Sequence, residues 1–292
     1  MASLRQIKTK ISSVKGTSRI MSAMKLISAV KLKRAQDLLM AYRPYSDAYQ
    51  DTTMNVAKRC DQKWHPLLRK SEEPKKLHLV FITSDRGLCG SFNSSLIRKL
   101  ETYLVTDTES FEEVAFSFLG RRGRDHFGKE GLRVTSSYIG ITERNYSEIS
   151  EKVSTELTNE FVKGDSDEVI LVYNYFKSAL TQEITYEKIL PIESGSEGED
   201  EILVDYLYEP TRKGILNDLL PKYAQVRVQR AIQESMTSEH AARMTAMENA
   251  TSNANDVIKN LTLLYNKTRQ AMITTELMDI VNGTEALSKG DE

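Results

Sequence analysis

The sequence predicts an α/β protein in which long N- and C-terminal helices form an antiparallel coiled coil, with an inserted, doubly wound α/β domain packed at one end of it. Apolar residues recur at heptad spacing near both chain ends, which is typical of paired helices. In the middle of the chain, short apolar strands alternate with helices. The predicted divisions are an N-terminal coiled-coil helix over 1–59, the α/β domain over 75–192 and a C-terminal coiled-coil helix over 207–288.

The composition indicates a folded chain with room for long helices. Of 292 residues, 40% are hydrophobic and 28% are charged, and only 6 are prolines, which interrupt helices. Two cysteines, Cys60 and Cys89, make no disulfide framework and favour a reducing compartment. The four histidines are scattered and predict no metal site. No apolar run has the length of a membrane span, and no secretory signal is visible.

The first helix is expected over residues 4–57. Its heptad residues stand in a 3,4 spacing that favours a left-handed coil, namely Leu4, Ile7, Ile11, Val14, Met21, Leu32, Ala35, Leu39 and Tyr42. The pattern is interrupted at Ser18, Lys25 and Ser28, where a neighbouring stripe is expected to take over, formed by Ile20, Met24 and Ile27. Pro44 is expected to kink or punctuate this helix.

The middle of the chain predicts a mostly parallel, Rossmann-like sheet. Strands are expected at 77–83, 113–119, 132–138 and 169–176, with a further, edge strand at 184–192. Helices are expected at 91–103, 121–128 and 146–162. The acidic, Gly- and Ser-rich stretch 193–201 is expected to be a loop.

The last helix is expected from Pro210 to about Leu287, with a kink or a fresh start at Pro221. At 1.5 Å per residue, some 60 to 75 helical residues would span roughly 90–110 Å. Its expected heptad residues are Met247, Ala250, Ala254, Val257, Leu261, Leu264, Thr268, Ala271, Thr275 and Met278. Two such helices can bury their apolar stripes only against each other.

A second apolar face on the last helix points to a partner outside the chain. Ile273, Leu277 and Ile280 lie away from the heptad stripe. A helix that is apolar on two faces is surrounded by protein, which two helices alone do not provide. A sleeve of partner subunits around this end is one interpretation. The other is a local hydrophobic patch or a third contact with the chain itself.

The two chain ends also differ in charge. Residues 1–36 carry nine lysines and arginines and no acidic residue, whereas residues 231–292 carry five basic and nine acidic residues. Nucleic-acid binding, a transit peptide and contact with an acidic partner helix all fit a basic end. The unbroken heptad and the lack of a nucleic-acid reader motif favour the partner helix.

Two glycine-rich turns follow predicted strands, where phosphate-binding loops also occur. The stretch 84–93 (SDRGLCGSFN) lacks the Gly-Lys-Ser/Thr of a P-loop and the spacing of a dinucleotide fold. We interpret it as a tight turn that docks the α/β domain on the coiled coil. The stretch 120–125 (GRRGRD) is interpreted as a solvated helix start. No catalytic constellation and no cofactor are expected.

Several segments together resemble the gamma subunit of F-type ATP synthases, of bacterial type. The resemblance covers essentially the whole chain and is carried by residues 11–36, Arg43-Pro44-Tyr45, 84–93, 205–210 (DYLYEP), 238–247 (SEHAARMTAM) and 265–277 (YNKTRQAMITTEL). One departure is Thr284, where the family's terminal signature has alanine after Gly283. The chain lacks the cysteine-bearing insertion of chloroplast members, so thiol control is not expected.

This resemblance implies a central rotor without catalytic residues. Its implied partners are a hexamer of alpha and beta subunits, the epsilon subunit and a membrane ring of c subunits, with the chain peripheral to the membrane and no nucleic acid bound. By resemblance, the beta subunits are contacted by Met24, Lys25, Arg269, Gln270, Thr274 and Glu276. The c ring and epsilon are met by a foot that contains Tyr206, Tyr208 and Glu209. A coiled-coil adaptor and a nucleotide-binding enzyme remain alternatives.

Overall fold

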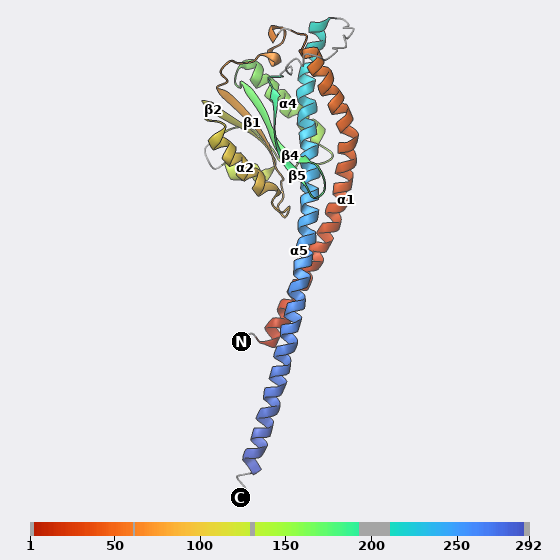
Figure 1. Cartoon of the computed structure of the whole chain (residues 1–292), viewed down its shortest axis with the longest axis vertical. Coiled ribbons are helices and arrows are strands. Elements are labelled where there is room, and N and C mark those ends of the chain that lie inside the picture. Colours follow the sequence, from red (N-terminus) through yellow and green to blue (C-terminus); the bar gives the residue numbers. More distant parts are fainter. Residues whose placement is uncertain (1–2, 61, 129–131, 193–210, 289–292) are drawn as a thin grey trace, which may run out of the picture. The chain divides into compact units, whose positions relative to one another are not determined.

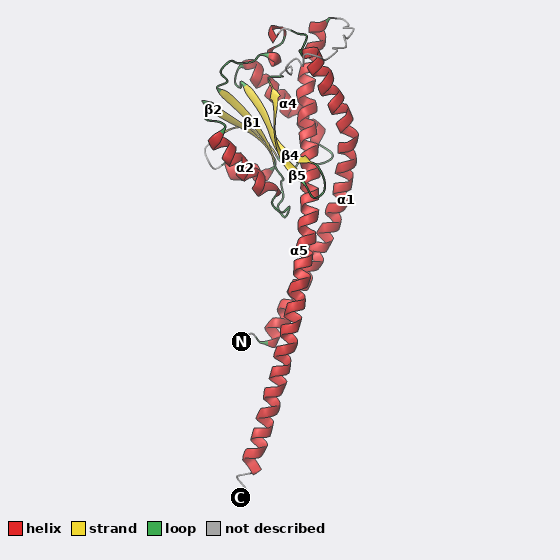
Figure 2. Cartoon of the chain, viewed as in Figure 1, coloured by secondary structure: helices red, strands yellow, loops and turns green. Residues whose placement is uncertain are grey.

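The computed structural model describes residues 3–60, 62–128, 132–192 and 211–288, without the side chains of Gln62, Arg212 and residues 283–288. Figure 1 shows its elements in sequence colours, and Figure 2 separates helices from strands. The chain divides into two compact units, one over Ser28–Thr245 and one that combines Met1–Ile27 with Ala246–Glu292. The helices α1 (Leu4–Ala57) and α5 (Arg212–Ser288) each contribute to both units.

The larger unit contains the sheet that the sequence predicts. Its strands are β1 (Lys76–Ile82), β2 (Glu113–Leu119), β3 (Arg133–Tyr138), β4 (Glu168–Phe176) and β5 (Gln182–Leu190). Within the described chain they form one sheet in the order β3-β2-β1-β4-β5. All neighbours are parallel except β4 and β5, which are antiparallel. The mostly parallel sheet and its edge strand are therefore confirmed.

One face of the sheet is covered by α2 (Phe92–Thr106) and α3 (Arg121–Phe127). Side chains alternate along a strand, so Leu77, Leu79 and Phe81 of β1 share this face. They pack with Leu96 and Leu100 of α2. This cluster is closed within the inserted segment of the chain and uses neither terminal helix.

The opposite face is covered by α4 (Tyr146–Lys163) together with parts of both terminal helices. Val80 and Ile82 of β1 point to this side and join a core with Val153 of α4 and Leu220 of α5. Figure 1 shows α5 running beside β4 and β5. Helices on both faces confirm the doubly wound arrangement, and they explain why β1 and β4 read as continuous apolar runs.

Both terminal helices continue through their prolines. α1 includes Pro44 and α5 includes Pro221, so a fresh helix start at Pro221 is excluded. The two helices are antiparallel in each unit. In the larger unit Arg43 pairs with Glu234, and in the smaller one Lys25 pairs with Glu248. The Lys25–Glu248 pair also joins the basic end to the acidic one, as the charge pattern predicts.

The predicted change of stripe in α1 is wrong. Ser18 and Ser28 are buried, whereas Ile20 and Ile27 are 63% and 58% exposed. The heptad stripe thus continues through the serines. A small side chain lets the helices approach closely, and the Ser18 hydroxyl lies 3.2 Å from Asn255 Oδ1, within hydrogen-bonding distance. Of the apolar residues that were expected to replace the serines, Ile20 and Ile27 lie outside the helix pair and Met24 is half-buried.

The heptad of α5 is right in period and partly wrong in position. Ala254, Leu261 and Thr268 face α1 as predicted, but the positions between them are filled by Ile258 and Tyr265. The expected Val257 and Leu264 are 43% and 49% exposed. Two adjacent apolar stripes run along this part of α5, so the sequence did not distinguish which one faces α1.

Candidate partner-binding surfaces

Among the described residues of its unit, no helix packs against the C-terminal part of α5. Ser18 lies opposite Asn255 and Lys25 opposite Glu248 in an antiparallel pair, so Leu4, the start of α1, lies level with the region of Arg269. Thr268 is the last partly buried residue, and every position from 269 to 282 is exposed. We name residues 269–282 the α5 tip.

The α5 tip carries the second apolar face that the sequence predicts. Ile273, Leu277 and Ile280 are 50%, 58% and 62% exposed, and Met272 and Val281 add to the same exposed apolar surface. Exposed apolar surface of this extent marks an interaction site. The predicted contacts Arg269, Gln270, Thr274 and Glu276 lie on this segment, and all four are exposed. The Thr274 hydroxyl donates to the Gln270 carbonyl at 2.9 Å.

Met24 and Lys25 form a second surface, on α1. Met24 is half-buried, and Lys25 Nζ lies 2.6 Å from Glu248 Oε1, with more than a third of each side chain exposed. Leu26 and Ile27 beside them are more than half exposed. Lys25 therefore has a partner within the chain while its side chain still reaches the surface. The predicted foot residues Tyr206, Tyr208 and Glu209 lie outside the described residues, as does the 193–201 stretch.

The glycine-rich turn after β1 is filled by groups of the chain itself. The Asp85 carboxylate accepts the backbone N–H of Arg121 at 2.9 Å and that of Gly140 at 2.7 Å. It thus occupies the N-terminus of α3, where an anion would otherwise bind. Ser84 N–H donates to Asn93 Oδ1, and Asn93 Nδ2 donates to the buried Cys89 sulfur at 3.2 Å. These bonds fix the turn without a ligand.

The same turn docks on α5, as the sequence analysis expected. Arg243 Nη2 donates to the carbonyl oxygens of Arg86 at 3.2 Å and Gly87 at 3.3 Å. The guanidinium is held by Glu239, one helical turn earlier, at 2.7 Å. Burial raises the pKa of Glu239, although Arg243 acts in the opposite direction. The neighbouring His240 has a pKa lowered to about 4, by burial first and then by Arg243 and Lys31.

Three hydrogen-bonded side chains at the sheet have the serine–histidine–carboxylate connectivity of a hydrolase triad, but their serine is buried. His78 Nε2 lies 2.8 Å from Ser117 Oγ, and His78 Nδ1 lies 2.8 Å from Glu160 Oε2. Hydrogen bonding to His78 lowers the pKa of Glu160. Ser117 is 2% exposed and bonds onward to Ser136. A substrate carbonyl has no access to such a serine. The three hydrogen-bonded side chains instead connect β1, β2 and α4. Sequence spacing gave no sign of this connection.

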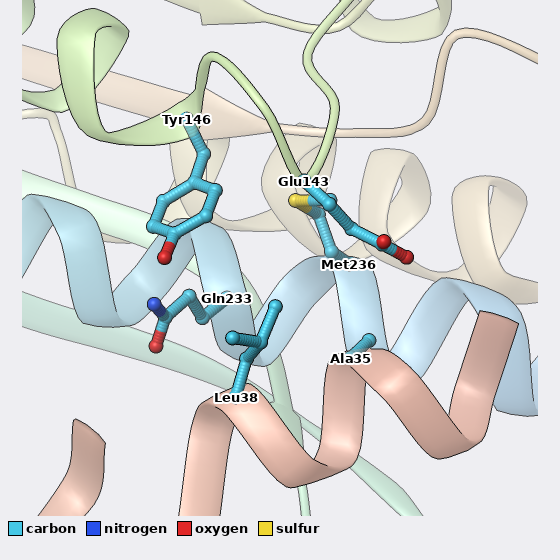
Figure 3. A pocket seen from close by; sticks show the side chains of 6 residues that line it. All are labelled: Ala35, Leu38, Glu143, Tyr146, Gln233 and Met236. Carbon is cyan, nitrogen blue, oxygen red and sulfur yellow. The ribbon is translucent and has the colours of Figure 1, made fainter. Parts of the chain in front are cut away.

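One pocket opens between α1, α5 and the segment that leads into α4. Figure 3 shows its lining, which is Ala35, Leu38, Glu143, Tyr146, Gln233 and Met236. Gln233 Oε1 is buried and has no hydrogen-bond partner. Its lining holds one charged side chain, Glu143, and no serine, cysteine, lysine or histidine. Among the described residues, no group of His, Cys, Asp or Glu could hold a metal ion. Burial raises the pKa of the Cys89 thiol, which makes it a poor nucleophile.

These features define a class of protein in which paired terminal helices carry an α/β sheet and one helix end is exposed. In the part of the chain that is described, no helix is long and apolar enough to cross a membrane. A family model described as ATP synthase matches residues 3–287, and the chain belongs to that family.

Curated relatives specify the subunit. The chain is 42% identical over 290 residues to the ATP synthase gamma chain of Anaeromyxobacter sp., covering 98% of this chain and all of the relative. It is 43% identical over 295 residues to the gamma chain of Bdellovibrio bacteriovorus, covering 98% and 99%. The resemblance to bacterial gamma subunits is thereby confirmed.

Solved structures agree with the fold. One is the central stalk and c ring of the Tetrahymena thermophila mitochondrial ATP synthase, with 26% identity, a TM-score of 0.58 and coverage of 79% of this chain and 99% of that chain. Another is a chain of the Euglena gracilis mitochondrial ATP synthase, with 21% identity, a TM-score of 0.69 and coverage of 99% and 96%. The second likeness supports the fold alone.

Proposed function

We propose that this chain is the central rotor stalk subunit of an F-type ATP synthase and that it is not itself catalytic. It would transmit torque between a proton-driven c ring and a catalytic hexamer of alpha and beta subunits, which couples proton translocation to ATP synthesis or hydrolysis. The α5 tip carries this proposal, because its apolar residues are exposed beyond the level of Leu4, where α1 begins. Surrounding subunits would bury that surface.

The mechanism follows from the asymmetry of one helix pair inside a ring of like subunits. The Met24–Lys25 surface exists only on α1, and the exposed Arg269, Gln270, Thr274 and Glu276 exist only on α5. At any angle, each beta subunit would meet a different face. A shift in nucleotide affinity requires such a difference in contacts between states. Rotation would then move each catalytic site through states of different affinity.

The remaining assignments extend this proposal. We assign the beta-subunit contacts to the two surfaces above, and the contact with the c ring and epsilon to Tyr206, Tyr208 and Glu209. The functional division would be a coiled-coil helix over 1–59, the α/β domain over 75–192 and a second coiled-coil helix over 207–288. The chain would be peripheral to the cell inner membrane, on its cytoplasmic side, as part of the assembled complex.

Reconstitution with alpha and beta subunits tests the proposal. The chain is expected to form a complex with them that hydrolyses ATP, and failure to do so would favour a coiled-coil adaptor instead. Within the complex, replacing both Gln270 and Thr274 by alanine is expected to lower coupled ATP synthesis or assembly several-fold. Thr102→Ala on α2 is the matched control, because its hydroxyl makes the same bond to the carbonyl four residues earlier.

A further inference from the structure

A buried clamp joins α1, α5 and the sheet at the carboxyl end of β4. Arg43 of α1 donates to both carboxylate oxygens of Glu234 on α5, from Nε at 2.9 Å and from Nη2 at 2.7 Å. The same Nη2 donates to the Phe176 carbonyl of β4 at 2.7 Å, and the Phe176 N–H donates to Glu234 at 3.0 Å. The guanidinium also lies 4.9 Å from the centre of the Tyr175 ring.

The clamp is buried, and its two-point geometry makes it directional. Glu234 has no exposed side-chain surface, and the Arg43 side chain is 18% exposed. Burial acts to lower the pKa of Arg43, but the hydrogen bond and charge of Glu234 outweigh it and raise that pKa. A forked guanidinium that binds a carboxylate at two points fixes an angle as well as a distance. A single apolar contact does not fix the angle in this way.

A second row of contacts repeats the connection two helical turns away. Arg227 of α5 pairs with Glu187 of β5 and donates to Gln50 of α1. Glu187 in turn accepts from the Tyr173 hydroxyl of β4 at 2.7 Å. Between the rows, Arg230 of α5 pairs with Asp47 of α1. Polar contacts therefore tie the same three elements at two levels, on the side of the sheet that α5 covers.

We propose that the Arg43–Glu234–Phe176 clamp sets the torsional stiffness between the sheet and the helix pair, with Arg43 as its positioning residue. This inference rests on the proposed rotor function. Two helices packed through a narrow apolar seam, with serines at several positions, can slide and twist against a sheet. Bidentate charged contacts at defined backbone positions resist that twist. Rotation of the helix pair would then be transmitted to the sheet with little angular lag.

The test measures angular fluctuation of the shaft in the assembled alpha/beta/gamma complex. A rod is attached to a cysteine introduced at the exposed Lys99 on α2, in a Cys60→Ser background, and the hexamer is immobilised with rotation halted. Arg43→Met is expected to raise the angular variance of the rod at least two-fold, and Arg43→Lys by less. Arg98→Met, an exposed arginine on α2, is the control and is expected to leave the variance unchanged.

The outcomes separate the inference from the proposed function. If the unmodified chain forms no ATPase complex, the rotor function fails. If that complex forms and Arg43→Met leaves the variance unchanged, only the inference fails. Should Arg43→Met not assemble, Glu234→Gln, which keeps the side-chain shape, is expected to raise the variance. Unchanged variance, or loss of assembly, in both Glu234→Gln and Arg43→Lys would overturn the inference, because the contacts would then serve folding alone.

Discussion

His240 is a half-buried base placed beside two cations. Its pKa is lowered to about 4 by burial, with further contributions from Arg243 and Lys31, and its Nδ1 has no hydrogen-bond partner. An unfolded histidine titrates near pH 6.5. As pH falls from about 6.5 towards 4, His240 is protonated in the unfolded state but stays neutral in the folded state. Acidification across this window therefore destabilises the fold.

This environment predicts a measurable pH dependence. The free energy of unfolding is expected to fall by up to about 3 kcal/mol between pH 6.5 and 4 through His240 alone. His240→Gln removes this titration, so urea unfolding of the variant should depend less on pH over that window. The Glu160 carboxyl, whose pKa is lowered by His78, adds a loss at lower pH that both proteins share. Equal pH slopes for both proteins would contradict the assignment.

Two glycines predict opposite effects of the same substitution. Gly120 has φ of 108°, and an added Cβ would lie 2.1 Å from the Thr83 carbonyl oxygen. Gly120→Ala is therefore expected to destabilise the chain by at least about 2 kcal/mol. Gly16 lies inside α1, and an added Cβ would have no neighbour within 4 Å apart from the adjacent backbone of its own helix, so Gly16→Ala is expected to stabilise by about 0.5–1 kcal/mol. Thermal unfolding followed by circular dichroism compares the two variants. A loss of stability in Gly16→Ala would contradict the conclusion that a methyl group fits at this position without a clash.

At the scale of elements, every helix and strand of the inserted domain could be predicted from sequence to within a few residues. Their apolar periods and glycine turns are local signals. Which residues of α1 and α5 face each other could not be predicted, because Ser28 is polar yet buried and Ile27 is apolar yet 58% exposed. Such choices depend on how closely two helices approach, which is a property of the pair. The His78–Ser117–Glu160 chain was missed for the same reason, since its members meet only in the folded sheet.

The position of the α5 seam gives a prediction for neighbouring residues. Ile258 is half-buried towards α1, whereas Val257 is 43% exposed. Ile258→Ala is expected to cost about 1–2 kcal/mol, and Val257→Ala is expected to stay within about 0.5 kcal/mol of the unmodified chain. Denaturant unfolding of the isolated chain measures both. A larger loss of stability for Val257→Ala than for Ile258→Ala would indicate that Val257 faces α1, as the heptad alone predicted.

For the whole molecule, the carboxyl edge of the sheet decides between a nucleotide-binding enzyme and a rotor. Doubly wound sheets bind their ligands at that edge. Here Asp85 binds the N-terminus of α3, Arg243 binds the turn after β1, and Glu234 binds the end of β4. Two of these three groups belong to α5. A helix of the chain thus occupies the place where a cofactor would lie, which joins the sheet to the helix pair.

The α5 tip leads to a prediction that concerns the chain alone and in its complex. An exposed helical segment with few tertiary contacts is marginally stable in water, and its amides open with little cost in free energy. In the isolated chain, amides of residues 269–282 are expected to exchange with solvent at least 100-fold faster than those of 226–238, where α5 is largely buried. In the complex with alpha and beta subunits, the tip should become protected while 226–238 changes little. Slow exchange of the tip in the isolated chain would mean that the segment is stabilised without partners, and the argument for a surrounding sleeve would then fail.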